Sequence, residues 1–366
     1  MDAPFLADPK RAARAIDALR RGWAVKIISG QHAIYVSAME SADAQKLSRS
    51  CGLLISASRA ATLKLTNQYS AADTHHPVLI TKPDDMNSAQ IIAIGDPTLD
   101  LRYPMKGPFA ALPLADPAMG DAAMELARLA GLLPAFLVYR DANDAGDASD
   151  AGDEGADLDA VSRADVDSYN DAAHLRIAAH AHLPVLANAR SEIYAFRSDA
   201  DASDHIALVV GVRDDSAPVV RLHSECLTGD ILGSLKCDCG PQLHEALAQI
   251  SGAQWGVLLY LRQEGRGIGL INKLRAYALQ DQGFDTVDAN IRLGFAVDAR
   301  DFSVAARMLR LLNIDTVRLL TNNPNKVSGL EAEQITVAER LPLKIAANPH
   351  NADYLATKRD RTGHNL

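Results

Sequence analysis

The stretch VLLYLRQEGRGIGLINKLRAYAL, residues 257–279, passes from an apolar run through a glycine-rich turn into a helical pattern. The run at its start is typical of a buried strand, and the residues after Gly269 have the spacing of an amphipathic helix. Glycines let the backbone approach an anion, and the N–H groups that begin a helix attract one. The stretch therefore predicts an α/β fold with an anion site at the turn, although the G-K-[ST] ending of a P-loop is missing.

Similar patterns extend in both directions from this stretch. Strands are expected at 23–29, 33–38, 205–212, 218–223 and 316–321, and helices at 15–22, 121–134 and 302–314. Residues 141–160 repeat Asp, Ala and Gly, and such a tract buries too little apolar surface to offset its ordering entropy. We expect an α/β protein with α+β mixed sheets, divided into a domain at 1–140, an acidic insertion and linker at 141–182, and a domain at 183–366.

Composition limits the classes of function. The 366 residues carry a formal net charge of -9, which argues against broad nucleic-acid binding but permits a local basic pocket. Four cysteines in a chain of this length do not form a secreted disulfide framework. The first 22 residues lack the apolar run of a signal peptide, and no later run has the length of a membrane span. These features predict a soluble cytoplasmic protein with no membrane partner.

Three of the four cysteines lie in SECLTGDILGSLKCDCG, residues 224–240, at Cys226, Cys237 and Cys239. Thiolate-rich sites favour zinc among common cellular metals, and a catalytic zinc site keeps one position open for water. Two other interpretations remain at this point. The site is a closed structural one completed by His223 or His244, or the three thiols are unconnected. An open site that activates water is modestly favoured.

Basic residues gather in the same half of an otherwise acidic chain. Together with the glycine-rich turn and the cysteine loop, they indicate a triphosphate or a similar anion. These residues are Arg221, Lys236, Arg262, Arg266, Lys273, Arg275, Arg300 and Lys326.

Four long motifs carry a resemblance to a known family: RLHSECLTGDILGSLKCDCGPQL (221–243), YLRQEGRGIGLINKLRAYALQDQGFDTVDAN (260–290), LGFAVDARDF (293–302) and RLLTNNPNKV (318–327). Residues 183–366 resemble GTP cyclohydrolase II of riboflavin biosynthesis. That family hydrolytically opens the imidazole ring of GTP, releasing formate and pyrophosphate and leaving 2,5-diamino-6-(5-phosphoribosylamino)pyrimidin-4-one. Departures are small: Val185 replaces a common threonine, and Gly267 stands where many members carry asparagine.

The resemblance implies a role for each matching residue. It makes the three cysteines the ligands of one zinc ion per chain, Asp298 a proton acceptor, Arg300 a nucleophile and Tyr277 a participant in ring opening. It also implies Mg²⁺ on the substrate triphosphate, with ligands that the sequence does not identify, and a homodimer. The implied GTP-binding residues are Arg221, Leu222, His223, Ser224, Glu225, Gln242, Glu264, Gly265, Arg266, Thr286, Thr321 and Lys326.

The chemistry of Asp298 and Arg300 leaves one alternative open. Two residues apart on an extended segment, they point to the same side and can pair. Arginine is normally a charge clamp with a high pKa, so a phosphoguanidinium at the α-phosphorus rests on the resemblance alone. The alternative is a clamp that stabilises the transition state without a covalent step.

The N-terminal domain resembles 3,4-dihydroxy-2-butanone-4-phosphate synthase more weakly, in AIDALRRGWAVKII (15–28), SCGLLISASRAATLKL (50–65) and LARLAGLLPAFLVYRD (126–141). The acidic motif of that family is absent from residues 29–41, and its R-x-G-H-T-E-A motif is replaced by ADPAMG, residues 115–120. We expect a catalytically inactive remnant. For the whole chain, the alternative to an enzyme is a noncatalytic, zinc-dependent guanine-nucleotide sensor, and a related enzyme for another guanine nucleotide is a third possibility.

Overall fold

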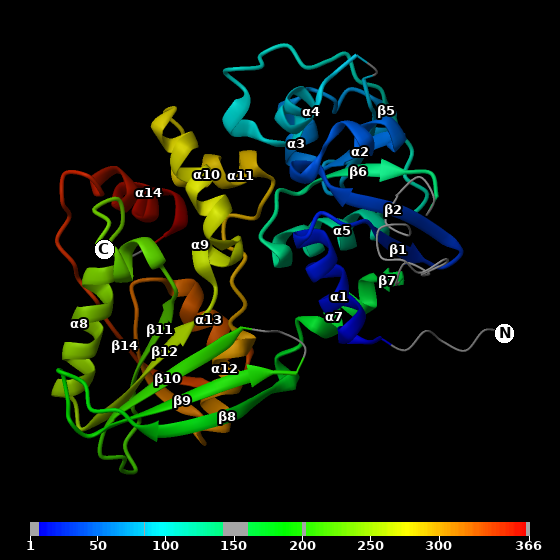
Figure 1. Ribbon diagram of the computed structural model, residues 1–366. Coiled ribbons are helices and arrows are strands. Elements are labelled where there is room, and N and C mark those ends of the chain that lie inside the picture. Colours follow the sequence, from blue (N-terminus) through cyan, green and yellow to red (C-terminus); the bar gives the residue numbers. More distant parts are fainter. Residues whose placement is uncertain (1–6, 84, 142–159, 200–202, 364–366) are drawn as a thin grey trace. The chain divides into compact units, whose positions relative to one another are not determined.

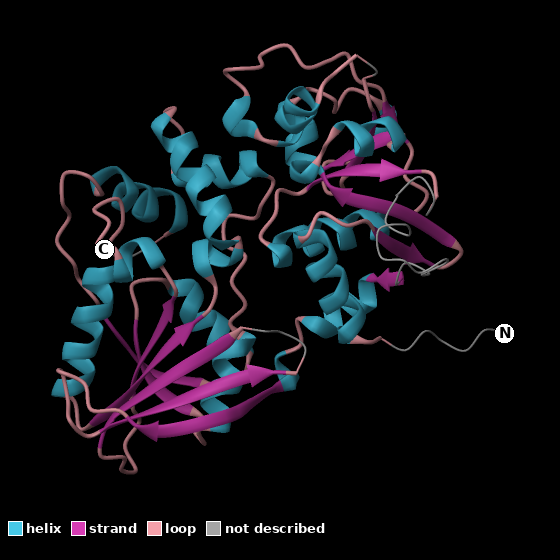
Figure 2. Cartoon of the chain, in the orientation of Figure 1, coloured by secondary structure: helices cyan, strands magenta, loops and turns pink. Residues whose placement is uncertain are grey.

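The structure is a computed structural model that describes residues 7–83, 85–141, 160–199 and 203–363. Contacts divide the chain into two compact units (Figures 1 and 2). Unit 1 contains Met1–Asp171 and Ile268–Val297, and unit 2 contains Ala172–Gly267 and Asp298–Leu366. Among the described residues, no helix is both long enough and apolar enough to cross a bilayer.

Unit 1 is built on a seven-stranded sheet of order β5-β4-β3-β6-β2-β1-β7, in which only β1 and β7 pair in parallel. Its strands are β1 (Val25–Ser29), β2 (His32–Ala38), β3 (Gly52–Ile55), β4 (Val78–Thr81), β5 (Ala111–Leu112), β6 (Ala135–Tyr139) and β7 (Ala160–Ser162). Its helices are α1 (Pro9–Arg20), α2 (Ala44–Arg49), α3 (Ala57–Thr62), α4 (Ser88–Gly95), α5 (Pro117–Ala130), α7 (Arg163–Tyr169), α10 (Gly269–Asp281) and α11 (Thr286–Leu293), with short turns η1 (Met39–Ser41), η2 (Tyr69–Ala71) and η3 (Pro97–Leu99).

Alternation along the strands gives this sheet two apolar faces. Phe136 and Val138 of β6 lie in one core with α1 and α5, whereas Leu137 and Tyr139 lie in a second core with Ile91 of α4. Successive side chains of a strand point to opposite faces, so one short strand supplies both cores. The unit therefore has the core expected from the apolar patterns of its sequence.

Residues 268–297 pack with unit 1 although the sequence places them inside the expected domain at 183–366. Leu279 and Leu293 share a core with Leu133, the Nδ2 of Asn272 donates to the carbonyl of Leu132 (3.1 Å), and Arg275 pairs with Glu40 (3.3 Å). Unit 1, as its contacts define it, therefore includes a segment from within the range 183–366. A contiguous sequence pattern does not reveal that a segment leaves one unit and packs with the other.

Part of the expected linker is also regular structure. Within 141–182, the described residues form β7, α7 and β8, and α7 begins with a capping box between Ser162 and Asp165. The side chain of Asp165 is fully buried and accepts hydrogen bonds from the backbone of Asp8 (2.7 Å) and Ser162 (2.8 Å). Most of the acidic tract, residues 142–159, lies outside the described residues.

Unit 2 has a mixed seven-stranded sheet of order β14-β13-β11-β12-β10-β9-β8. The four strands from β14 to β12 pair in parallel, and the pairs from β12 through β10 and β9 to β8 are antiparallel. The strands are β8 (Leu175–His182), β9 (Ser191–Ser198), β10 (Asp204–Gly211), β11 (Val219–Ser224), β12 (Trp255–Leu261), β13 (Thr316–Leu320) and β14 (Thr336–Leu341). The helices and short turns are η4 (Ala172–His174), η5 (Leu227–Ile231), α8 (Cys239–Gly252), α9 (Glu264–Gly267), α12 (Ser303–Leu311), α13 (Pro324–Ala332) and α14 (Ala352–Thr362).

Helices cover both faces of this sheet. Ala246 and Ile250 of α8 share a core with Val219, whereas Val220 and Leu222 lie in the opposite core with α12. Side chains at 219, 221 and 223 of β11 therefore share the face that α8 covers. The fold class expected from the sequence, α/β with mixed sheets, is confirmed.

A buried charge cluster holds part of unit 1 together, and it gives a test of this fold. Asp100 accepts a bidentate pair from Arg59 (2.7 and 2.9 Å), whose side chain is 2% exposed, and it also binds Lys106. Asp100→Asn leaves both cations buried without their carboxylate, and we expect a loss of about 3–5 kcal/mol in the unfolding free energy of this unit. Urea denaturation followed by circular dichroism measures it.

A matched control is Asp17→Asn, which breaks an exposed ion pair with Arg21. Exposed pairs contribute about 0–1 kcal/mol, so this variant should unfold like the wild type. Equal, small losses in both variants would contradict a structural role for the buried cluster.

Candidate functional site

The parallel strands of unit 2 define one edge at which polar side chains gather. β11 pairs in parallel with β12 on one side and with β13 on the other, so the carboxyl ends of the three strands meet. The strands end at Ser224, Leu261 and Leu320. Because the strand order reverses around β11, this edge is a topological switch point, where α/β sheets characteristically bind ligands.

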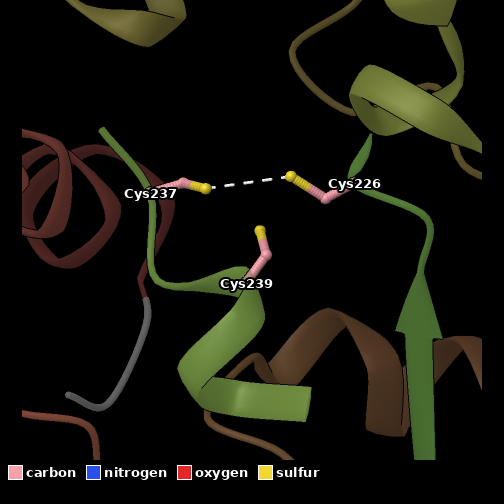
Figure 3. A group of neighbouring side chains, drawn as sticks. All are labelled: Cys226, Cys237 and Cys239. Atoms are coloured by element: carbon pink, nitrogen blue, oxygen red, sulfur yellow. Dashed lines mark hydrogen bonds between the residues drawn. The ribbon is translucent and has the colours of Figure 1, made fainter. Parts of the chain in front are cut away.

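The three cysteines converge just beyond β11. Their sulfur atoms all lie within 4.8 Å of one another, with Cys226 and Cys237 Sγ 3.8 Å apart. Cys226 follows the strand, and Cys239 begins α8. Figure 3 shows the three sulfurs turned toward one another. The three thiols therefore form a single cluster, so the interpretation as three unconnected thiols is wrong.

The packing and chemistry of this cluster fit a thiophilic metal. Gly229 lies against all three cysteines, and a Cβ there would come within 2.7 Å of Cys237 Sγ and 3.1 Å of Cys226 Sγ. Hydrogen-bonding contact with Cys226 and Cys237, followed by burial, raises the pKa of Cys239 well above its ordinary value. A bound cation opposes this effect by favouring the thiolates, since metals bind the deprotonated form. The donor set is compatible with zinc.

Neither histidine that was considered as a fourth ligand belongs to the cluster formed by the described residues. His223 Nε2 lies 3.0 and 3.1 Å from the two carboxylate oxygens of Asp230. Burial lowers the pKa of His223, and Asp230 opposes that effect. His244 lines an apolar pocket of about 630 Å³ with Leu186 and Leu247. This geometry favours an open three-thiol site over one closed by histidine.

A buried basic group lies beside the cysteines on the face of β11 that α8 covers. Arg221 is 6% exposed, and its two Nη atoms donate to the carbonyl of Leu320 (3.0 Å) and to Gln242 Oε1 (2.5 Å). Burial lowers the pKa of Arg221 to about 10. Its Nε is buried with no hydrogen-bond partner among the described residues. An unsatisfied buried donor of this kind is expected where a ligand binds.

Lys326 adds a second buried cation from α13. Its Nζ donates to the carbonyl of Leu222 (2.7 Å), whose own side chain lies in the opposite core. Leu222 therefore offers only its backbone at this edge. Thr321, which follows β13, accepts a hydrogen bond from the backbone of Asn323 (3.0 Å).

The glycine-rich turn after β12 has an unusual backbone. Gly265 and Arg266 both adopt left-handed conformations, with φ of 64° and 63°. Positive φ is uncommon for arginine and indicates local strain, which is often found at functional sites. Glu264 accepts a hydrogen bond from the backbone of Leu227 (2.7 Å), and Glu225 pairs with Arg262 (2.9 Å). These contacts connect the turn to the cysteine loop.

Asp298 and Arg300 form the pair expected from their spacing. Nε and Nη2 of Arg300 lie 2.8 and 2.5 Å from the two carboxylate oxygens of Asp298. Burial alone raises the pKa of Asp298, but hydrogen bonds and the charge of Arg300 outweigh it, so the pKa is lowered. The backbone of Ala299 donates to the carbonyl of Arg266 (3.1 Å), and a Cβ at Gly267 would meet Ala299 O at 2.7 Å. The pair is thus packed directly against the glycine-rich turn.

Two predicted site residues belong to unit 1. Tyr277 lies on α10, where Lys273 Nζ is 5.8 Å from its ring centroid, and Thr286 begins α11 and accepts a hydrogen bond from Gln280 (3.0 Å). The other predicted site residues all lie in unit 2.

The sequence did not single out several residues that organise this site. Gly229, Asp230 and Tyr260 contact the cysteines or His223, and Asp238 accepts a hydrogen bond from Gln242 (2.5 Å). Asp230 lies four residues after Cys226, and Asp238 stands between two cysteines. The sequence signal that could have identified both aspartates is their closeness to the candidate metal ligands.

Comparisons with known proteins identify the family of this chain. The family model described as GTP cyclohydrolase II matches residues 176–342. A GTP cyclohydrolase-2 from Azospirillum brasilense is 41% identical over 362 residues, which cover 96% of this chain and 92% of the relative. The chain belongs to the GTP cyclohydrolase II family. It is a hydrolase of this kind, as the resemblance of its sequence motifs predicted.

Other relatives of this GTP cyclohydrolase II family member match different lengths of the chain. A GTP cyclohydrolase-2 from Azotobacter vinelandii is 57% identical over 175 residues, covering 48% of this chain and 84% of the relative. A riboflavin biosynthesis protein RibBA from Salinispora arenicola is 46% identical over 262 residues, covering 69% of this chain and 62% of the relative. The chain therefore spans less than two thirds of that RibBA protein.

Gly229 provides a test of the cluster as a metal centre. Gly229→Ala places a methyl group among the sulfurs, and we expect metal affinity to fall about 10- to 100-fold, as when contacts that support a metal site are lost. Competition with a chromogenic chelator measures the affinity. Gly252→Ala is the control, because a Cβ there meets nothing within 4 Å. Equal metal affinity in the two variants would contradict a metal bound by these thiols.

Proposed function

We propose that this chain is the GTP cyclohydrolase II of a riboflavin biosynthesis pathway and acts hydrolytically on GTP. The products are formate, pyrophosphate and 2,5-diamino-6-(5-phosphoribosylamino)pyrimidin-4-one. The observation that carries the proposal is the group of three sulfurs within 4.8 Å of one another, at the same sheet edge as two buried cations. Three thiolates, with no histidine in the cluster among the residues that the structure describes, leave a coordination position for chemistry.

Cys226, Cys237 and Cys239 would hold one zinc ion per chain. When bound, zinc supplies the Lewis acidity that activates water for hydrolysis near neutral pH. Gly229 keeps the sulfurs close, and Asp230 fixes the backbone of Cys226 (3.0 Å). Mg²⁺ would accompany the triphosphate, because phosphate oxygens are its usual ligands.

The remaining residues bind and orient the nucleotide. Arg221 and Lys326 would attract the anionic substrate from buried positions, and the Glu264–Arg266 turn would present backbone N–H groups. The other nucleotide contacts are assigned to Leu222, His223, Ser224, Glu225, Gln242, Gly265, Thr286 and Thr321. Tyr277 keeps the role in ring opening that its motif implies.

Asp298 would accept a proton and orient Arg300 at the α-phosphorus. The bidentate pair fixes the plane of the guanidinium, which suits either a nucleophile or a clamp on a developing phosphate charge. Only a guanidinium can form this bidentate pair with Asp298, whereas a lysine would supply a point charge alone.

Unit 1 would be catalytically inactive toward sugar phosphates. The stretch 29–41 holds a single carboxylate, Glu40, which accepts a hydrogen bond from the backbone of Leu133 (2.8 Å) and pairs with Arg275. A magnesium-dependent reaction on a sugar phosphate needs carboxylates that are free to bind the ion. The apolar cores of the unit support a structural role, and the proposed role includes support for a homodimer.

The proposal is tested with zinc-loaded protein incubated with GTP and Mg²⁺ while formate and the diaminopyrimidine are assayed together. The wild type should release both, and Cys226→Ser, Cys237→Ser and Cys239→Ser should abolish formate release without unfolding the chain. Cys51→Ser replaces the exposed cysteine of unit 1 and should remain active. GTP binding without product would favour the nucleotide sensor, and global unfolding of the three variants would favour a structural metal.

Arg300 separates the phosphate chemistry from ring opening. Arg300→Ala should lower kcat for pyrophosphate and formate release by about 10²–10³, the usual effect of losing one group that stabilises transition-state charge. Arg300→Lys should recover little, because lysine cannot form the bidentate pair with Asp298. Rapid-quench measurement of pyrophosphate gives the release rate of each variant. A near-native rate for the lysine variant would contradict a guanidinium-specific role.

A further inference from the structure

Asp230 is a buried carboxylate at the centre of a network that none of the proposed roles uses fully. It lies in η5 between Cys226 and Cys237, and 3% of its side chain is exposed. His223 Nε2 lies 3.0 and 3.1 Å from its two oxygens, one of which also accepts hydrogen bonds from the hydroxyl of Tyr260 (2.9 Å) and from the backbone N–H of Cys226 (3.0 Å). One side chain therefore contacts both the cysteine loop and the strands of the sheet.

The sheet fixes the two aromatic donors of this network. His223 of β11 and Tyr260 of β12 are register partners in the parallel pair, and their rings stack with centroids 5.6 Å apart and planes 19° apart. Both rings lie on the face of the sheet that α8 covers, as residues 219 and 221 do. The network is therefore built from regular strands rather than from a flexible loop alone.

The carboxylate determines which nitrogen of His223 carries the proton. The oxygens of Asp230 act as acceptors toward Cys226 and Tyr260, so we assign Nε2, the ring nitrogen that faces them, as the donor, and in the neutral ring Nδ1 is then an acceptor. Burial favours the neutral ring. The Nδ1 atom is buried with no hydrogen-bond partner among the described residues. His223 thus holds an unused acceptor inside the protein.

A second unused atom lies on the same face of β11. Arg221 Nε is also buried without a partner among the described residues, and residues two apart on a strand point to the same side. Lys326 is close enough for its charge to act on His223. This sheet edge thus combines an acceptor and a donor that have no partner among the described residues with the nearby charge of Lys326, a combination suited to a polar, anionic ligand.

We propose that Asp230 is a positioning residue that links the metal loop to the nucleotide site. Its carboxylate fixes the backbone of Cys226 and holds His223 with Nδ1 open, and Nδ1 accepts a hydrogen bond from an N–H or O–H of the nucleotide. The partner of His223 is therefore the base or the ribose rather than a deprotonated phosphate oxygen, which has no proton to donate. This inference rests on the proposed function, and its test includes measurements that do not require turnover.

The decisive variant is Asp230→Asn, which keeps the shape of the side chain but replaces one oxygen with a donor. If the amide oxygen faces Cys226 and Tyr260, the NH₂ group takes the position of the oxygen that lies 3.0 Å from His223 Nε2, and there it favours the tautomer with the proton on Nδ1. If the amide is reversed, it faces the N–H of Cys226 and leaves that donor unpaired. Either orientation breaks one of the two functions assigned to Asp230.

Four measurements follow from this choice. Proton–nitrogen NMR of ¹⁵N-histidine-labelled protein should show His223 protonated at Nε2 in the wild type and, in Asp230→Asn, either protonated at Nδ1 or accompanied by faster zinc release to a chelator. The kcat/KM for GTP should fall about 10- to 100-fold, the usual cost of losing a residue that orients metal ligands. The melting temperature reports whether the fold is retained.

Two controls separate positioning from general packing. Tyr260→Phe removes one hydrogen bond from the network but leaves those to His223 and Cys226, so it should keep the wild-type tautomer and zinc release. Asp214→Asn makes the same chemical change elsewhere in unit 2, at a carboxylate that accepts from Trp255 Nε1 (3.0 Å) and from the backbone of Ser216 (2.9 Å). It should also retain both properties.

The outcomes distinguish this inference from the proposed function. Wild-type His223 protonated at Nδ1 would overturn the inference even if no variant folds, and so would an Asp230→Asn protein with unchanged tautomer and zinc release. A wild-type protein that produces no formate from GTP contradicts the proposed function, while the tautomer and the zinc release still decide the role of Asp230.

Discussion

The parallel pairing of β11 with β12 and β13 is the constraint on which the rest of the site depends. It brings three strand ends to one edge, and residues of the proposed site lie just beyond those ends: Cys226 after β11, Glu264 after β12 and Thr321 after β13. The same register stacks His223 on Tyr260. The cysteine loop follows the end of β11 and the glycine-rich turn follows the end of β12. Without this pairing, nothing regular would hold these two irregular segments next to each other.

Burial at this edge creates the electrostatic conditions that hydrolysis of an anionic substrate needs. Arg221, His223 and Lys326 are each at most 6% exposed, and removing charged groups from water is costly unless other groups compensate. Backbone carbonyls, Gln242 and Asp230 supply part of that compensation, but Arg221 Nε and His223 Nδ1 have no partner among the described residues. Two buried groups at this edge therefore have hydrogen-bonding capacity that the described residues do not use.

The sequence predicted the regular parts of this structure well, since the apolar runs of β11 and β12 and the helical spacing after Gly269 follow directly from side-chain periodicity. It also predicted that Asp298 and Arg300 can pair, and in the structure both the backbone N–H (3.2 Å) and the guanidinium Nε (2.8 Å) of Arg300 donate to the Asp298 carboxylate. It did not predict that residues 268–297 pack with unit 1, which depends on long-range contacts such as Asn272 with Leu132. Nor did it identify Asp230 or Gly229, whose importance depends on the positions of atoms distant in the sequence.

The central claim is that the three cysteines form an open metal centre, and X-ray absorption at the zinc edge tests it most directly. The account predicts three sulfur ligands at about 2.3 Å and one light ligand without the outer-shell scattering of an imidazole ring, because a catalytic zinc keeps a position for water. In Cys226→Ser the sulfur count should fall to two. A spectrum with imidazole scattering, or with four sulfurs, would show a site closed by the protein and would contradict the account.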